Sequence, residues 1–280
     1  MTTIEFDAKT HPGKVRDHNE DCIFASAESH LWIVADGMGG HACGEVASEI
    51  VVSEISKLVP GGQHLVEAIE LSHTAVLDEA AINTAAKGMG ATVVAMQLQG
   101  SRYAIAWVGD SRCYRLRKNK LELLTRDHSY LEWLRDNGIA VEEARKHPKR
   151  NVITQSIGVG EPNPDIVHGE HCAGDRYLLC SDGLNDELTD EEILAILRGS
   201  ESGEIVTENL IKAALDSGGR DNISVIVIDI EPDSRAKSLL SAQTLLAPLY
   251  SNRHIQKWLP ATCGVLAAII AAIIIKLFVA

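Results

Sequence analysis

Short apolar runs bounded by turn residues recur through the first 230 residues and predict a set of β-strands. Several runs are rich in Val and Ile, which pack well on a pleated sheet. They cover residues 31–35, 91–98, 103–108, 177–180 and 223–230. Residues 112–121 have the pattern of a β-hairpin with its turn at Lys118-Asn119. Because consecutive strands follow one another without intervening helices, we expect antiparallel pairing.

Other stretches carry apolar residues at helical spacing and predict two pairs of helices. Residues 44–58 and 65–86 form the first pair. In the second pair, one helix starts at Thr189, where Glu192 three residues later completes a capping-box signature, and the other covers residues 204–215. Helices that cluster in pairs favour the α+β class over a regular βαβ alternation.

The composition restricts the class of protein. Hydrophobic residues make up 45% and charged residues 23% of the 280 residues, which suits a globular chain with a core. The net charge of -13 argues against a nucleic-acid partner, since such partners require a basic surface. The six cysteines form no C-x-x-C pair, so we interpret them as small core residues in a reducing compartment.

The character of the chain changes after residue 232. Residues 233–257 read as a linker or juxtamembrane segment, and residues 258–280 as a transmembrane helix with Lys276 reaching the far interface. Trp258 fits an interfacial anchor, and the basic Arg253 and Lys257 indicate that the globular part, residues 1–232, faces the cytoplasm. The alternative is a terminal helix buried in the core, which this uniformly apolar stretch does not favour.

Aspartates beside glycines follow several of the predicted strands. Asp36-Gly37 and Asp182-Gly183 each come directly after an apolar run, and Asp221-Asn222 comes just before one. Asp110 follows another run, and Glu20-Asp21 lies near the N-terminus. One Asp-Gly alone is an ordinary turn. Several carboxylates converging on one cleft would repel one another unless a cation lay between them, and Mg²⁺ and Mn²⁺ prefer oxygen ligands.

These motifs, in this order, resemble those of the metal-dependent PP2C-type Ser/Thr protein phosphatases, also called PPM phosphatases, and especially the bacterial members. The resemblance covers residues 10–230. The matching elements are residues 16–21, 34–41 (Val-Ala-Asp-Gly-Met-Gly-Gly-His), 90–92, 108–112 (Val-Gly-Asp-Ser-Arg), 124–128, 153–158, 181–184 (Ser-Asp-Gly-Leu) and 219–222 (Gly-Arg-Asp-Asn). The resemblance implies a four-layer αββα sandwich, in which two antiparallel sheets are flanked by helices.

The resemblance also implies roles for individual residues. A two-metal centre of Mn²⁺ or Mg²⁺ is expected to be held by Asp36, the Gly37 carbonyl, Asp182 and Asp221, with Glu20 and Asp21 binding a metal or its waters. Asp110, sharing with Asp182, corresponds to a third and weaker metal site. Arg16 corresponds to the arginine that grips the substrate phosphate, which suits a planar guanidinium. Asn222 is expected to support the site beside Asp221.

The expected reaction is hydrolysis of phosphoserine and phosphothreonine in proteins by a metal-activated water, with no phosphoenzyme. The partners would be phosphorylated proteins, among them a Ser/Thr kinase and its substrates. A single-pass anchor would hold the enzyme in the cell inner membrane. Met38 stands where some relatives have a histidine proposed as the general acid, so the proton for the leaving group must have another source. We interpret His41 as structural.

Four further points concern a flap beside the site and three alternative functions. Residues 130–151 are expected to form a flap beside the site, whose basic residues Arg145, Lys146, Lys149 and Arg150 either recognise phosphopeptides or simply face solvent. A regulatory protein on a degenerate phosphatase fold would lack metal ligands, and every expected carboxylate is present. A phosphodiesterase or nuclease remains possible for two-metal chemistry, although the acidic surface disfavours it. A kinase lacks support, because the sequence has no glycine-rich nucleotide loop with its lysine.

Overall fold

The computed structural model describes residues 2–39, 43–83, 86–140, 143, 147–149, 152–199 and 202–232. Thr2–Glu231 form one compact unit. The predicted linker and transmembrane segment, His41, and the basic residues Arg145, Lys146 and Arg150 lie outside the described residues. No helix within the described ranges is long and apolar enough to cross a bilayer.

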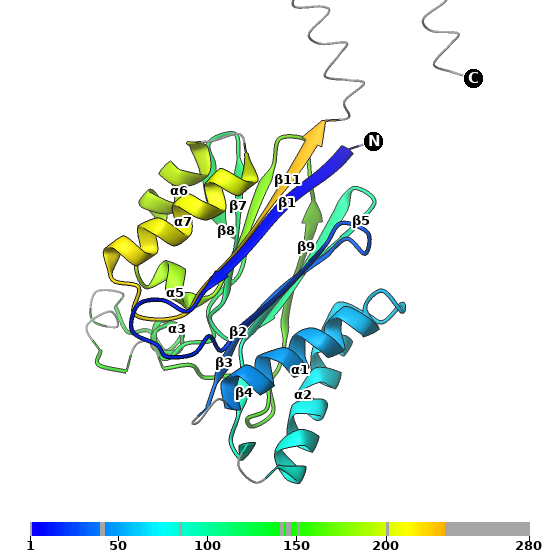
Figure 1. The fold of residues 1–280 in the computed structure, drawn as a ribbon, viewed down its shortest axis with the longest axis vertical. Coiled ribbons are helices and arrows are strands. Elements are labelled where there is room, and N and C mark those ends of the chain that lie inside the picture. The colour runs from blue at the N-terminus through cyan, green and yellow to red at the C-terminus, as the bar shows by residue number, and fades with distance from the viewer. Residues whose placement is uncertain are drawn as a thin grey trace, which may run out of the picture. The chain divides into compact units, whose positions relative to one another are not determined.

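Two β-sheets form the centre of this unit (Figure 1). The first sheet has the strand order β1-β11-β10-β7-β8, and the second has the order β2-β3-β5-β6-β9 with β4 paired to β3. The strands are β1 Thr2–His11, β2 Asp21–Ser26, β3 Leu31–Met38, β4 Gly90–Ala91, β5 Val93–Gln99, β6 Arg102–Val108, β7 Arg112–Arg117, β8 Lys120–Leu123, β9 Asp165–Glu170, β10 Arg176–Cys180 and β11 Ile223–Pro232. The pairs β2–β3, β3–β5, β5–β6, β6–β9, β7–β8, β7–β10 and β10–β11 are all antiparallel, as expected.

Helices cover the outer face of each sheet (Figure 1). The helices are α1 Cys43–Leu58, α2 Leu65–Ile82, α3 Tyr130–Asp136, α5 Asp182–Asn185, α6 Asp190–Arg198 and α7 Gly203–Ser217. Helices α1 and α2 pack on the β3 sheet, and α5, α6 and α7 pack on the β10 sheet. The prediction of two antiparallel sheets flanked by helices is therefore confirmed.

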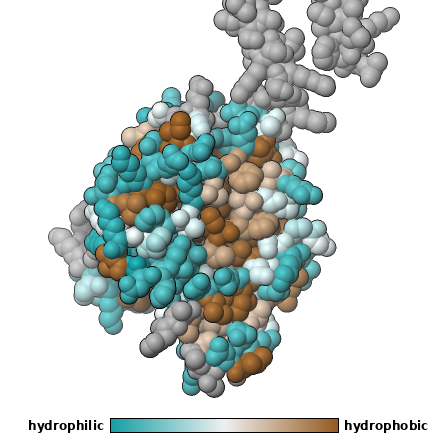
Figure 2. Space-filling view, viewed as in Figure 1, coloured by the Kyte–Doolittle hydropathy of each residue, from teal (hydrophilic) through white to brown (hydrophobic). Residues whose placement is uncertain are grey.

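Alternation along single strands builds the layers. In β3, Leu31 and Ile33 face α1 and α2, whereas Trp32 and Val34 face the opposite sheet. Strand β10 behaves in the same way, with alternate residues facing the other sheet and the α6–α7 layer. Each central strand is thus apolar on both faces, which explains why these strands appear in the sequence as continuous apolar runs. Polar side chains cover much of the outer surface, and an apolar band reaches it between the layers (Figure 2).

The hairpin and the capping box form as predicted. Lys118 and Asn119 have positive φ angles of 49° and 64°, which a two-residue hairpin turn of type I′ requires. The Thr189 hydroxyl accepts a hydrogen bond from the Glu192 backbone N–H at 3.3 Å, and the Glu192 carboxylate accepts one from the Thr189 N–H at 2.9 Å. The start of α6 is therefore encoded locally.

One predicted boundary was wrong. Helix α2 ends at Ile82 rather than at residue 86, because Asn83 has extended dihedral angles and its N–H bonds to the Glu79 carbonyl as a cap. The predicted strand over residues 91–98 breaks at Thr92. Strands β4 and β5 on either side of Thr92 pair with β3 in one register, and the Thr92 N–H donates to the Asp36 carbonyl at 2.8 Å between them. The predicted run therefore lies along β3 over its whole length.

Replacing Thr189 with Ala should lower the free energy of unfolding by about 1 kcal/mol, because an orphan N–H at the start of α6 loses its acceptor. Urea denaturation followed by circular dichroism measures this loss. Thr189→Ser keeps the hydroxyl and serves as the control, with an expected change of only a few tenths of a kcal/mol. An equal loss in both variants would show that the methyl group, not the cap, stabilises this turn.

Candidate active site

The predicted carboxylates are brought together at one end of the sandwich by strands from both sheets. Asp21, the first residue of β2, lies directly opposite Asp36 of β3 in the antiparallel register. Asp182 follows β10, and Asp221 precedes β11 by two residues. Asp110 follows β6 by two residues. Strand ends are rigid, so these carboxylates hold their positions without help from mobile loops.

Burial and crowding perturb these carboxylates strongly. Burial raises the pKa of Asp21 to about 6 and that of Asp182 to about 7. The pKa values of Asp36 and Asp110 are also raised well above the usual range. Loss of water is the main cause in each case, and repulsion from neighbouring carboxylates adds to it. The cluster therefore binds either protons or cations much more readily than separate surface aspartates would.

The donor chemistry fits divalent cations. Within the described ranges, one buried oxygen of each of Asp21, Asp110 and Asp182 has no hydrogen-bond partner. Buried polar atoms normally have partners, so unpaired carboxylate oxygens indicate a missing cationic ligand. No group of three or more His, Cys, Asp or Glu side chains in the described part is already arranged around one point to hold a metal.

Arg16 lies within the cluster. Its guanidinium donates to the Asp221 carboxylate at 2.6 Å, and about half of the arginine side chain is exposed. The sequence predicts that this arginine grips a substrate phosphate, and its position beside a predicted metal ligand is compatible with that role. In this structure the guanidinium also neutralises Asp221.

Asn222 connects three parts of the site. Its side-chain oxygen accepts from the Glu20 N–H at 2.8 Å, and its amide group donates to the Pro12 and His18 carbonyls, both at 2.9 Å. One uncharged side chain therefore fixes the whole loop that carries Arg16 and Glu20 to the start of β11. These three hydrogen bonds are how Asn222 could perform the predicted supporting role.

Close backbone packing explains two of the glycines. A Cβ on Gly37 would lie 2.0 Å from the Gly44 carbonyl oxygen, and a Cβ on Gly183 would lie 2.0 Å from the Asn222 carbonyl oxygen. The Gly37 N–H donates to the Glu20 carbonyl at 3.0 Å. Only glycine fits at either place, so the residue after each aspartate sets how closely the segments of the site approach.

Hydroxyl groups beneath the carboxylates were not assigned roles from the sequence. Ser181 donates to Asp21 at 2.7 Å and accepts from the Ser224 N–H at 3.0 Å, which connects the two sheets. The Thr92 and Ser111 hydroxyls form a buried hydrogen bond at 2.7 Å. Ser111 follows Asp110 and Ser181 precedes Asp182 in the sequence motifs. This adjacency was the one sequence signal that could have predicted a role for these two serines.

The fold and this centre together define a two-sheet sandwich with a cation-binding carboxylate cluster at its edge. The family model described as "Protein phosphatase 2C" matches residues 13–202. The chain belongs to the protein phosphatase 2C family.

Individual relatives agree with this assignment. The Ser/Thr protein phosphatase PstP of Mycobacterium tuberculosis is 38% identical over 93% of this chain and 51% of its own length, so the chain spans about half of that relative. A Ser/Thr phosphatase stp of Listeria welshimeri is 36% identical over 79% of this chain and 94% of its own. The crystal structure of M. tuberculosis PstP superposes with a TM-score of 0.77 at 38% identity, covering 83% of this chain and 100% of that one. A PstP catalytic domain in complex with two manganese ions gives 0.74 at 35% identity, with 83% and 100% coverage.

The raised pKa values predict how the stability of the metal-free protein depends on pH. A carboxyl group whose pKa is higher in the folded than in the unfolded state holds its proton more tightly when folded. Its contribution to the free energy of unfolding is complete below the unfolded value near pH 4 and is lost as pH rises through the folded value. For Asp21 and Asp182 the loss falls between about pH 4 and pH 7.

Urea denaturation in the presence of EDTA at pH 5 and pH 8 measures this loss. The decrease should be smaller in Asp182→Asn, which removes one of the titrating groups. Mn²⁺ at a hundred times its dissociation constant should add about 2.7 kcal/mol at pH 8. An identical pH dependence in the wild type and in Asp182→Asn would contradict the assignment of this titration to the cluster.

Proposed function

We propose that this chain is a metal-dependent protein phosphatase that removes phosphate from phosphoserine and phosphothreonine. The main observation in support of this proposal is the cluster of aspartates at the strand ends, which have raised pKa values and unpaired oxygens. Membership of the protein phosphatase 2C family and the names of its relatives support the same activity. The manganese-bound relative supports Mn²⁺ or Mg²⁺ as the cofactor.

The proposed ligands follow from the positions of the carboxylates. Asp36, Asp182 and Asp221, together with the Gly37 carbonyl, would hold two cations. Glu20 and Asp21 would bind them directly or through water. Burial, and then repulsion from Asp182, raise the pKa of Asp110. Asp110 would share a third and weaker metal site with Asp182. When bound, divalent cations supply Lewis acidity and lower the pKa of water, which provides a hydroxide nucleophile at neutral pH.

The residues of the chain position the two reactants. The water oxygen forms a bond to phosphorus while the bond from phosphorus to the Ser or Thr oxygen breaks, which yields inorganic phosphate and a protein hydroxyl. Arg16 would bind the phosphate oxygens as a planar donor, which requires it to turn away from Asp221. The leaving oxygen needs a proton, and the thioether of Met38, which packs towards Gly90, cannot supply it. The solvent at the rim of the site is therefore the proposed proton source.

Asp182→Ala should reduce phosphate release from a phosphothreonine peptide by at least about 100-fold, since loss of a charged group in the catalytic centre costs several kcal/mol. The assay uses the full chain with Mn²⁺, and then with EDTA, which should abolish release. Glu191→Ala, an exposed carboxylate in the first turn of α6, is the matched control. A folded Asp182→Ala protein with full activity would rule out the proposed centre.

We further propose that residues 258–280 anchor the enzyme as a single-pass span in the cell inner membrane, with the phosphatase domain facing the cytoplasm. The support is the apolar sequence with its flanking Trp258, Lys257 and Arg253. Such an anchor would bring the enzyme close to a membrane-bound Ser/Thr kinase and its substrates, so these phosphoproteins are the proposed partners.

Removal of residues 258–280 should move the protein from the membrane pellet to the supernatant after cell lysis and leave hydrolysis of a phosphothreonine peptide unchanged. Dephosphorylation of membrane-bound phosphoproteins in the cell should then fall. Immunoblotting of the two fractions and phosphoproteomics of the two strains measure these effects. If the truncated enzyme dephosphorylates the same cellular proteins equally well, the anchor does not direct substrate choice.

A further inference from the structure

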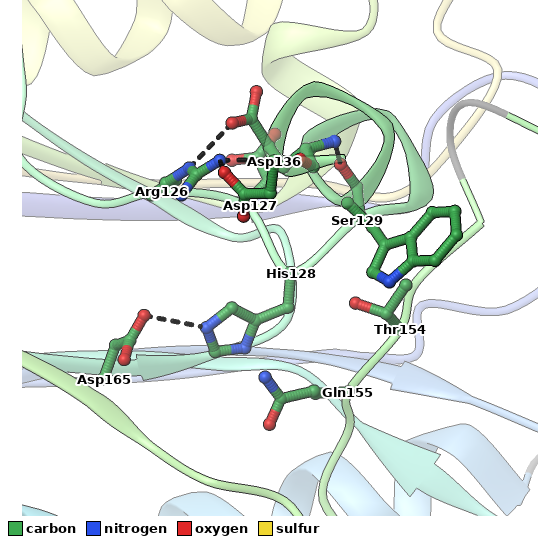
Figure 3. Close-up of a pocket in the computed structure, with 10 residues that line it drawn as sticks. Arg126, Asp127, His128, Ser129, Asp136, Thr154, Gln155 and Asp165 are labelled. Atoms are coloured by element: carbon green, nitrogen blue, oxygen red, sulfur yellow. Dashed lines mark hydrogen bonds and ion pairs between the residues drawn. The ribbon is translucent and has the colours of Figure 1, made fainter. Parts of the chain in front are cut away.

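A pocket of about 220 Å³ lies beside the carboxylate centre, at the base of the predicted flap. Its described lining comes from the loop before α3, from α3 itself, from the returning segment and from the start of β9 (Figure 3). The lining residues are Arg126, Asp127, His128, Ser129, Glu132, Trp133, Asp136, Thr154, Gln155 and Asp165. None of them is among the predicted metal ligands, so the pocket is separate from the metal centre.

His128 of the pocket lining connects the pocket to the predicted metal centre, because it bonds to Gly109, the residue before Asp110. The Gly109 N–H donates to Nδ1 of His128 at 3.2 Å, and the His128 N–H donates to the Gly109 carbonyl at 2.8 Å. Asp110 is the next residue along the chain. The Asp127 carboxylate is close enough to Asp110 to raise its pKa further. A peptide whose phosphorylated residue occupies the centre would therefore place a neighbouring side chain at this pocket.

The pocket is acidic. Because Nδ1 of His128 accepts a backbone N–H, the ring is neutral and donates from Nε2 to Asp165 at 3.2 Å. Figure 3 shows the ring directed at Asp165, with Gln155 and Thr154 on its other side. Arg126 is the one cationic side chain among the described lining residues, beside four carboxylates.

Salt bridges leave part of this negative charge unbalanced. Arg126 donates to Glu132 at 2.7 Å and to Asp136 at 2.6 Å, and Arg135 from outside the pocket also pairs with Glu132. Arg112, likewise from outside the pocket, forms two bonds to Asp127. Asp165 accepts from a neutral ring, and half of its side chain is exposed. Asp136 shares its guanidinium with Glu132 and is 59% exposed. Arg126 and Arg135 together balance Glu132 and Asp136, so Asp165 is the lining carboxylate that keeps negative charge available.

Trp133 adds an aromatic surface to the same pocket. The residue is 51% exposed, which is unusual for so large an apolar side chain. Its ring stacks on Tyr130, with centroids 5.3 Å apart and an angle of 14° between the planes, and the indole also lines the pocket. An exposed indole beside carboxylates is the combination that binds a cationic side chain, and a guanidinium both stacks on it and pairs with carboxylates.

We propose that this pocket is a specificity subsite for a basic side chain of the phosphoprotein substrate, with arginine preferred to lysine. The proposal rests on the proposed phosphatase function, since the metal centre must hold the phosphorylated residue for the pocket to contact its neighbour. The indole of Trp133 covers one face of the guanidinium, and Asp165 binds its N–H groups. The acidic pocket and the centre thus recognise opposite charges on one peptide.

The test measures kcat/KM of the full chain with Mn²⁺ for phosphothreonine peptides in which Arg, Lys, Ala or Glu is placed in turn at each position near the phosphothreonine. At one or two positions, Arg should exceed Ala by about three-fold to ten-fold, the range expected for one exposed cation–π contact with one exposed ion pair. Lys should fall between Arg and Ala. In Trp133→Leu and in Asp165→Asn the ratio of Arg to Ala should fall towards one, whereas Ile205→Ala, a half-exposed apolar residue on α7, should keep the wild-type ratio.

Failure of the subsite and failure of the proposed function give different results. Hydrolysis of all peptides at equal rates, or faster hydrolysis of Glu peptides, would overturn the subsite and leave the phosphatase activity in place. If no peptide is hydrolysed, the proposed function fails, and fluorescence anisotropy of labelled Arg and Ala peptides then tests the pocket by binding alone. Equal dissociation constants in that measurement would overturn the subsite as well. Because the wild-type comparison varies only the peptide, it stands even if a variant does not fold.

Discussion

Mutual repulsion among buried carboxylates is the constraint on which the rest of this structure depends. Asp21 and Asp36 face each other across a strand pair, and Asp182 and Asp110 approach from neighbouring strand ends. Each loses water on folding, and each raises the cost of ionising the others. A flexible scaffold would relax by separating them. The two sheets prevent this, because β3 and β10 are each paired on both sides and lie between apolar layers.

Uncharged groups hold the cluster in place, and this choice leaves the carboxylate oxygens available. Asn222 fixes the N-terminal loop through backbone groups, and Ser181 connects Asp21 to the opposite sheet. Had arginines or lysines supported the aspartates instead, their charges would have satisfied the cluster and competed with cations. Arg16 is the exception, since it pairs with Asp221. Under the proposed function, its exposure would allow it to leave that carboxylate for a phosphate, so the same charge would serve both partners at different times.

The sequence predicted most of the central fold because the strands and helices there carry strong local patterns. The hairpin turn at Lys118-Asn119 and the cap at Thr189 are examples of purely local signals. The edge strands β1, β2 and β9 were missed. Their residues are only half-buried and mix polar with apolar side chains, so no apolar run marks them.

The predicted carboxylates are brought together, but the hydrogen bonds of Thr92, Ser181 and Asn222 depend on residues distant in sequence, which no local pattern encodes. The lining of the pocket at Trp133 depends in the same way on the return of the flap to β9.

The negative charge of the chain acts in opposite ways on the two parts of a phosphorylated peptide: it repels the phosphate at the metal centre and attracts a basic side chain at the acidic pocket. A net charge of -13 repels a phosphorylated substrate at long range, and in the proposed mechanism bound cations and Arg16 would reverse the sign locally. The same negative field attracts basic segments of a partner. A substrate that carries its phosphate beside an arginine satisfies both fields at once, with the phosphate at the centre and the guanidinium at the acidic pocket. A substrate whose neighbouring residues are acidic would meet repulsion from Asp165 in addition to the general field. Salt screens the long-range part within about 10 Å, so the discrimination that remains at physiological ionic strength must come from the short contacts in the pocket itself.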